Sequence, residues 1–430
     1  MLPLDTATTH QSSLDRRSFL QHGIVGGLMA VSSSCVGTSS SKRQLPPNQI
    51  FFVSSGKTCV IRSDGTGFRV LEFSVPNQAT WQPVEFFSDG RRVLFLSMEP
   101  RRDGPGRPFD EYYTQTPTHI WSYDLTSDSL VELCTRDRMA PFQTPALLVE
   151  DTRILVQVVR KQVGQIWSMN LDGSDAREFT REGEGFPYGL SLSPDGRRVA
   201  FHTAGPAPHS YRIWTSDVDG GNRTLIAGHP EHLHFGPVWS NDGAWLSWVD
   251  CLQGRDPAHD WADVCVGRPD GTDVRTLTEG QSHWFGATYG NPTQRGSGSN
   301  MLAWTSTGEV LFTRKLPGSK LAWEFQAHRP DTDHFNRDWK PELARGGTEL
   351  CRIHPQTKAV TRLTASNPAV WDFRVSESTD GRDVVFCRCA TGEPPNLWVM
   401  KPDGSGQRQI STGIDGKGAD HPRWVPSRRG

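Results

Sequence analysis

The residues best suited to chemistry in this sequence are histidines, and they gather in one stretch of the chain. Nine of the 14 histidines lie between His202 and His334. His232 and His234, within HPEHLHFGPVWS, are two residues apart, so on an extended strand both imidazoles point to the same side. Both could then bind one cation. His283, in the later segment QSHWFGATYGNPTQRGSGSN, is a candidate third ligand that would leave coordination positions open for water or substrate.

Other kinds of chemistry find less support in the sequence. A histidine pair at the start of a strand is also common as a hydrogen-bonded surface feature, and this alternative to a metal site stays open. DTDHFNRD has several oxygen donors but lacks the spacing, the central Gly and the final Glu of an EF-hand. No Gly-x-Ser-x-Gly segment is present, which argues against a serine peptidase. The net charge of −2 and the pI near 6.7 give no support to nucleic-acid binding.

The elements that must position these residues come from a repeat near 50 residues long. Each copy has a strand, an Asp-Gly turn, a second strand, an Ile-Trp or Leu-Trp strand, another Asp-Gly turn and a closing strand. Clear copies start at Ser191, Val238 and Val375. Four short strands per repeat at this spacing indicate the blades of a β-propeller. The 15 tryptophans fit this pattern, and we expect most of them to form the core between blades.

Counting the copies predicts an all-β, seven-bladed propeller. Six blades are complete, and their inner strands start near Trp81, Phe142, Pro187, His234, Asn300 and Asp372. The stretch from Asn48 supplies three strands of a further blade, and HPRWVPSRRG, with Trp424, supplies its inner strand. We therefore expect the N-terminal strands and the C-terminal inner strand to close the ring together, which leaves few free sheet edges.

The fold predicts which loops share a face. The segments leading into the inner strands and the loops between second and third strands open on one face, and the Asp-Gly turns lie on the other. The histidine-rich segments fall on the first face, over the fourth and fifth blades. Two long insertions lie there as well, residues 281–300 and 315–347. Long irregular loops in a compact domain are often functional, so we expect the site over these two blades.

The N-terminal residues are predicted to direct export. Residues 1–35 contain Arg16-Arg17-Ser18-Phe19-Leu20 followed by a short apolar run, which resembles a Tat-type export signal. Cys35 could carry a lipid and so link the protein to a membrane. Residues 36–47 are interpreted as a flexible linker and residues 48–430 as the propeller. The expected location is the periplasm or cell envelope.

Seven cysteines follow the predicted signal, an odd number, so at least one has no partner within the chain. Cys251 and Cys265 flank one hairpin and could form a disulfide in an oxidising compartment. Cys387 and Cys389 lie on one face of a strand. Structural thiols are the preferred interpretation.

The blade phrases SLSPDGRRVAF, IWSMNLDG and LWVMKPDGSGQRQIS resemble TolB-like propeller repeats across the whole domain. HPEHLHFGPVWSNDG also resembles a segment of the oligogalacturonate lyases. That family binds a divalent metal, typically manganese, through a Gln-x-x-His-x-His element plus another histidine. The resemblance implies that His232 and His234 are metal ligands, and that His229 stands in the place of the glutamine. His283 is the candidate for the additional ligand.

The resemblance implies an exported, metal-dependent lyase that cleaves uronate-containing oligosaccharides by β-elimination. Such a reaction needs a base, groups that bind a carboxylate and groups that bind a sugar. Candidate bases are His259 and His334, and Arg295 and Arg337 are candidates to bind the substrate carboxylate. Candidate sugar-binding residues are Trp284, Trp323 and Glu324. The alternative is a non-catalytic TolB-like propeller whose histidines form a polar rim and whose long insertion docks a protein or an envelope polymer. Under either interpretation we expect a monomer.

Overall fold

A computed structural model describes residues 48–426 apart from several gaps. The gaps are residues 79, 100–117, 137–145, 149–150, 161–162, 205–210, 231, 253–260, 284–301, 326–336 and 366. The predicted export signal and linker lie outside the described residues. Within the described part of the chain, no helix has the length and apolar character needed to span a membrane.

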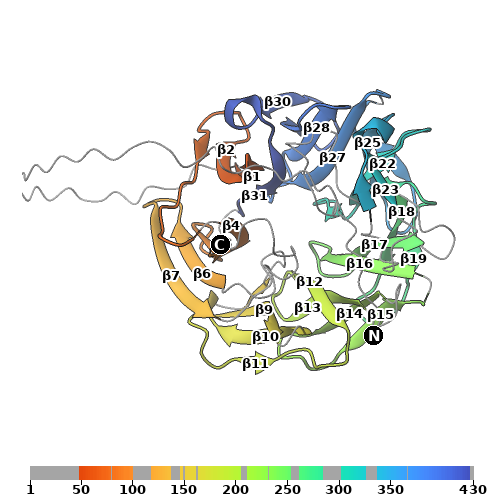
Figure 1. Ribbon diagram of the computed structural model, residues 1–430. Helices are drawn as coiled ribbons and strands as arrows, with labels where there is room; N and C mark the ends of the chain where they lie inside the picture. Colours follow the sequence, from red (N-terminus) through yellow and green to blue (C-terminus); the bar gives the residue numbers. More distant parts are fainter. Residues whose placement is uncertain are drawn as a thin grey trace, which may run out of the picture.

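The described chain is a seven-bladed β-propeller, as the repeat predicted (Figure 1). Three blades contain consecutive strands of the N-terminal half. They are β4 (Thr80–Phe86), β5 (Arg92–Met98), β6 (Thr118–Asp124) and β7 (Ser129–Arg136); β8 (Ala146–Leu147), β9 (Arg153–Arg160), β10 (Val163–Asn170) and β11 (Arg177–Glu178); and β12 (Phe186–Leu192), β13 (Arg198–Ala204), β14 (Arg212–Asp217) and β15 (Thr224–Gly228).

Three further blades follow in chain order. They are β16 (His232–Trp239), β17 (Leu246–Leu252), β18 (Trp261–Gly267) and β19 (Arg275–Thr276); β21 (Ala303–Trp304), β22 (Val310–Lys315), β25 (Thr348–Ile353) and β26 (Val360–Arg362); and β27 (Val370–Glu377), β28 (Val384–Ala390), β29 (Asn396–Met400) and β30 (Arg408–Ser411). Strand β20 (Ser282–His283) pairs with β18 and with β22, so it joins the first two of these blades into one sheet. Phe142 and Asn300, where two inner strands were expected to start, lie outside the described residues.

The seventh blade contains strands from both ends of the described chain. Its sheet has the order β3 (Arg69–Val70), β2 (Lys57–Arg62), β1 (Gln49–Ser54) and β31 (Asp420–Trp424). Ile50 pairs with Trp424 across β1 and β31. The indole N–H of Trp424 donates to the carbonyl of Ser376 in the neighbouring blade over 3.0 Å. Arg374 of that blade forms an ion pair of 2.7 Å with Asp420.

Turn chemistry and apolar faces explain why these residues form blades. In the turn after β12, the Ser193 hydroxyl donates to Asp195 and accepts the backbone N–H of Arg198, while Gly196 adopts a φ of +70°. Positive φ carries little cost only for glycine, which explains the repeated Asp-Gly. Between blades the apolar faces pack together. Trp248 and Trp371 are fully buried there, in agreement with the core role expected of tryptophan.

The cysteines confirm one expectation and contradict another. All seven in the described part of the chain are buried and outside disulfides, as expected for structural thiols. The suggested Cys251–Cys265 disulfide is wrong. Cys265 lies opposite Trp248 in the register of β17 and β18, so Cys251 is three residues away and its side chain points to the other face of the sheet. The two thiols accordingly belong to different core clusters.

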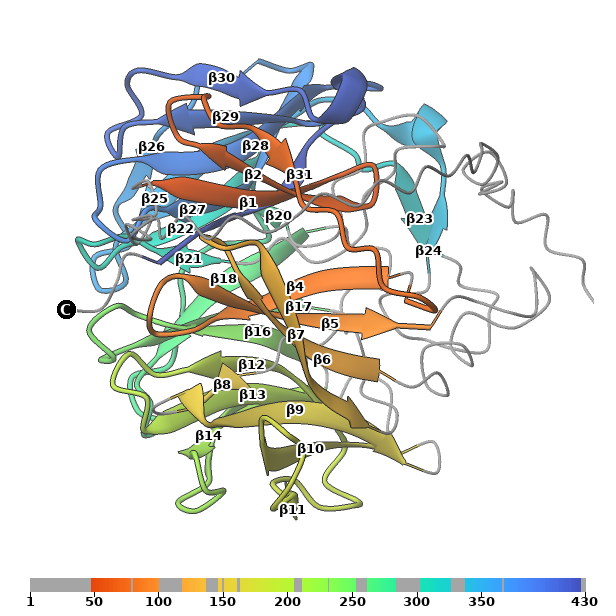
Figure 2. The ribbon, with the colours of Figure 1, turned by 90° about the vertical axis from the view of Figure 1, so that its left-hand side faces the viewer.

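The long fifth-blade insertion contains a hairpin of β23 (Trp323–Phe325) and β24 (Arg337–Trp339). Figure 2 shows this hairpin on the side of the molecule where β5 and β9 end, which we call the loop face. Leu321, at the base of the hairpin, is fully buried in a cluster with Trp371 and Ile50. The insertion is therefore anchored in the core of the last blade and of the blade that closes the ring.

Candidate metal centre

The pairing of β16 with β17 places two histidines and a carboxylate at the loop face. His232 is the first residue of β16, and His234 lies directly opposite Asp250 near the end of β17. A β-bulge between Phe235 and Val238 shifts the register below them, and Gly236 within it has a φ of +65°. The bulge therefore decides which residue of β17 faces His234.

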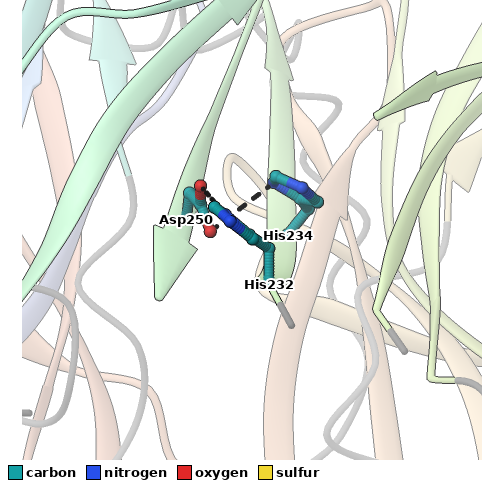
Figure 3. Close-up of side chains that lie close together, drawn as sticks. All are labelled: His232, His234 and Asp250. Carbon is teal, nitrogen blue, oxygen red and sulfur yellow. Dashed lines mark hydrogen bonds and ion pairs between the residues drawn. The ribbon is translucent and has the colours of Figure 1, made fainter. Parts of the chain in front are cut away.

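His232, His234 and Asp250 converge on one another, as Figure 3 shows. Each offers one potential ligand atom, and these three atoms lie within 4.8 Å of one another. Nδ1 of His232 lies 2.7 Å from Oδ2 of Asp250, and Nδ1 of His234 lies 3.8 Å from Oδ1 of the same carboxylate. The two imidazole rings are nearly parallel, at 18°, with centroids 5.6 Å apart. No other set of three potential ligands of this kind occurs among the residues described here.

The hydrogen bonds assign roles to the ring nitrogens. A carboxylate only accepts, so Nδ1 of His232 donates to Asp250 and its Nε2 keeps a lone pair. An ion bound by both His232 and Asp250 would have to replace the proton on Nδ1, because Nε2 lies on the far side of the ring from the carboxylate. Nδ1 of His234 accepts the indole N–H of Trp248 over 3.2 Å. An ion bound to His234 would have to replace this hydrogen bond.

Burial sets the charge of the centre. Burial is the largest cause, and together with the charges of His232 and His229 it lowers the pKa of His234 to about 3. The His234 imidazole is therefore neutral near pH 7, the form that can bind a metal. Burial also raises the pKa of Asp250, although the hydrogen bond and charge of His232 lower it. A buried carboxylate with raised pKa gains from a nearby cation.

The surroundings of one oxygen atom of Asp250 indicate whether these residues fit a metal ion. Oδ1 of Asp250 is buried and accepts no hydrogen bond within the described part of the chain. An unpaired buried oxygen costs free energy, and a cation between it and the neighbouring imidazoles would remove that cost. Two imidazoles and one carboxylate suit divalent ions such as Mn²⁺, Fe²⁺ or Zn²⁺. The donor set therefore fits a divalent cation with positions left for further ligands.

The other two proposed ligands have different positions. The exposed His229 contacts His232 edge to face, with ring centroids 4.7 Å apart. The backbone of His283 is in β20, opposite Trp261. Strand order places it three strands from β16, on the order of 14 Å at the usual strand spacing. Asp250, which the sequence analysis did not select, is the third group beside His232 and His234.

Most of the proposed catalytic and sugar-binding residues lie outside the described residues, namely His259, His334, Arg295 and Trp284. Three others belong to the β23–β24 hairpin. Glu324 is exposed and pairs with Asp338, while Trp323 pairs with Trp339 and Arg337 with Phe325 in the backbone register. The placement of these groups relative to the histidines stays a prediction.

No protein-family model matches this sequence. Among solved structures, an oligogalacturonate lyase in complex with manganese has a TM-score of 0.51 at 16% identity, with 85% of each chain covered. A puromycin hydrolase has a TM-score of 0.54 at 13% identity, and the match covers 87% of this chain and 54%, about half, of that one. TolB from Acinetobacter baumannii has a TM-score of 0.49 at 12% identity, covering 88% of this chain and 67% of that one. At these identities the lyase and hydrolase matches show a shared β-propeller fold.

Proposed function

We propose that His232, His234 and Asp250 bind a divalent cation in an exported carbohydrate-active enzyme. The observation that supports this most is the buried Oδ1 of Asp250, which accepts no hydrogen bond from the described residues and lies 3.8 Å from a neutral imidazole. The solved propeller described as bound to manganese suggests that ion as the first to test. Export by the twin-arginine segment, to the periplasm or envelope and with or without a lipid on Cys35, belongs to the same proposal.

The reaction we propose is β-elimination in a uronate-containing oligosaccharide. A base removes the proton on the carbon next to the uronate carboxylate, and the bond to the 4-O-linked sugar breaks. A divalent cation bound here would neutralise that carboxylate and stabilise the enolate-like charge. His234 would stay neutral, the form of imidazole that can bind the ion. His259 or His334 is the proposed base, and Arg295, Arg337, Trp284, Trp323 and Glu324 are the proposed substrate contacts.

Metal analysis of purified protein tests the proposal directly. We expect close to one divalent ion per chain, and loss of that ion in the His232→Ala/His234→Ala double variant. His354→Ala is a matched control, because this histidine follows β25 on the face opposite the loop face, which we call the turn face. Unchanged metal content in the double variant would show that His232 and His234 are not the metal ligands. The activity is tested by ultraviolet absorbance of unsaturated uronates on incubation with pectic oligomers, with and without a chelator.

The alternative function is binding without catalysis. One observation favours it: a groove of about 520 Å³ among the described residues lies away from the histidines. It lies between Arg69–Val75 and the strands β6 and β7, with Trp121 and Tyr123 in its wall. Under this alternative a protein or polymer partner would occupy that surface. Protein with no bound metal and no lyase activity would favour it.

A further inference from the structure

Three consecutive blades carry an ionisable residue at one position of their second strand. β17, β22 and β28 each begin with an apolar residue, and their fifth residues are Asp250, Arg314 and Arg388. We call these three residues the charged belt. The candidate metal centre contains its first member. In the three preceding blades, β5, β9 and β13 have an arginine before the first apolar residue, so the matching position is the sixth. The residues there are uncharged: Ser97, Val158 and Thr203.

Arg314 is paired to a carboxylate that is almost fully buried. Its Nε donates to Oε1 of Glu349 over 2.7 Å, and its Nη2 donates to the same oxygen. The Glu349 side chain is 4% exposed, whereas the Arg314 side chain is 29% exposed. The carboxylate is therefore shielded from solvent by the protein, while the guanidinium reaches the surface at the end of β22.

Arg388 repeats this arrangement one blade further on. Its Nε and Nη2 donate to Oδ1 and Oδ2 of Asp372, over 2.5 and 2.8 Å. The Asp372 side chain is 1% exposed and that of Arg388 is 19% exposed. The guanidinium also lies 4.7 Å from the centre of the Trp398 ring, which restricts its orientation.

In both arginines the protein carboxylate accepts hydrogen bonds from the same edge of the guanidinium, the one formed by Nε and Nη2. Nε and Nη2 are used, so Nη1 keeps two N–H groups and Nη2 keeps one. Within the described part of the chain, Nη1 of neither residue donates a hydrogen bond. A guanidinium in this state can receive a second carboxylate end-on, through one N–H of Nη1 and one of Nη2. Its position is already fixed by the buried counter-charge, which lowers the entropy lost on binding.

We propose that Arg314 and Arg388 are carboxylate-binding groups for an acidic oligosaccharide that extends from the metal centre across the loop face. This inference rests on the proposed function, since it takes the ligand to be a uronate oligomer. Packed sheets lie about 10 Å apart, so successive members of the belt are separated by distances of that order. One sugar carboxylate could not reach both arginines. The belt therefore favours an oligomer with several carboxylates over a monosaccharide or a neutral glycan.

Calorimetry with trigalacturonate tests the proposal. The variants are Arg314→Lys and Arg388→Lys, because lysine keeps the positive charge beside Glu349 or Asp372 but cannot offer a bidentate fork. We expect each variant to bind trigalacturonate about tenfold more weakly, with unchanged melting temperature and metal content. The neutral galactose trimer should bind more weakly than trigalacturonate to the wild type and equally to all variants.

Arg153→Lys is the matched control. Arg153 is 26% exposed and is ion-paired with Asp175, but it begins β9 at the turn face. Wild-type affinity for trigalacturonate in the Arg314→Lys/Arg388→Lys double variant would overturn the proposal, as would equal affinity for the neutral trimer. Arginine-dependent binding of a glutamate-rich peptide without binding of trigalacturonate would overturn it too. Loss of the metal in the histidine double variant tests the proposed function separately, so either proposal can fail alone.

Discussion

Trp248 donates its indole N–H to Nδ1 of His234 over 3.2 Å, and this bond opposes metal binding at either nitrogen of the ring. A neutral imidazole has one lone pair. A cation at Nδ1 would displace the indole, and a cation at Nε2 would leave an N–H on Nδ1 facing the indole N–H. The Trp248→Phe variant should therefore bind a divalent cation about 2- to 10-fold more tightly, which corresponds to one ordinary hydrogen bond.

Competition with a chromogenic chelator measures this change in affinity. Trp371→Phe is a suitable control, since Trp371 is equally buried in another blade and donates to Thr391. Both variants should lose some stability because a smaller ring leaves unfilled volume. Unchanged or weaker metal binding by Trp248→Phe alone would show that His234 is not a ligand.

The carboxylate of Asp250 makes a second prediction. Asparagine has nearly the same shape but no charge, so Asp250→Asn should lower metal affinity by at least tenfold. Burial raises the pKa of Asp250, which means that the folded protein disfavours its ionised form. The variant without metal should therefore melt at the same temperature or higher. Asp270→Asn, at an exposed turn of the same blade, should change neither quantity.

Isothermal titration and differential scanning calorimetry of both variants give the two measurements. A variant that keeps wild-type metal affinity would exclude Asp250 as a ligand. If Asp250→Asn instead fails to fold, the carboxylate has a structural role.

The blades could be predicted from the sequence because the information for each is local. The Asp195-Gly196 turn has equivalents in several other blades, and the side chains of the strands alternate around these turns. The contribution of Asp250 depends on a bulge. Below the bulge Val238 pairs with Ser247, and continuing that register would put Cys251 opposite His234. The extra residue in the bulge shifts the pairing by one position, so Asp250 lies opposite His234 instead. Its side chain is on the face of the sheet opposite to that of Cys251.

A sign of the bulge was present in the sequence. Gly236 interrupts the strand, and an isolated glycine within a strand often marks a bulge. The belt arginines were missed for a different reason. Arg314 and Arg388 stand out only when the second strands are aligned by register, because their carboxylate partners Glu349 and Asp372 come from other strands.

The ion pair between Arg374 and Asp420 predicts how stability responds to acid. Burial raises the pKa of Asp420, but Arg374, His421 and hydrogen bonds outweigh it, so its pKa lies below the ordinary value of 3.8. A carboxyl group whose pKa is lowered by folding stabilises the protein above the ordinary pKa and loses this contribution as pH falls through the lowered one. The stability difference between wild type and Asp420→Asn should therefore shrink as the pH falls below about 4.

Urea unfolding at a series of pH values gives that difference. Asp64→Asn is a control for lowered carboxyl pKa values in general, since Asp64 is held by Thr66 in an exposed turn. A difference that stays constant down to pH 3 would show that the ion pair does not stabilise the fold.

The turn beside the closing strand gives the last prediction. Gly413 has a φ of +78°, and a Cβ atom there would lie 1.9 Å from the carbonyl oxygen of Gly418. Gly56 has a similar φ of +72° with nothing within 4 Å of its Cβ position. Alanine costs about 1–2 kcal/mol at either position because of the left-handed backbone. Only Gly413→Ala adds a backbone collision, so its melting temperature should fall well below that of Gly56→Ala. Equal melting temperatures would mean that the segment before β31 moves freely enough to accept the methyl group.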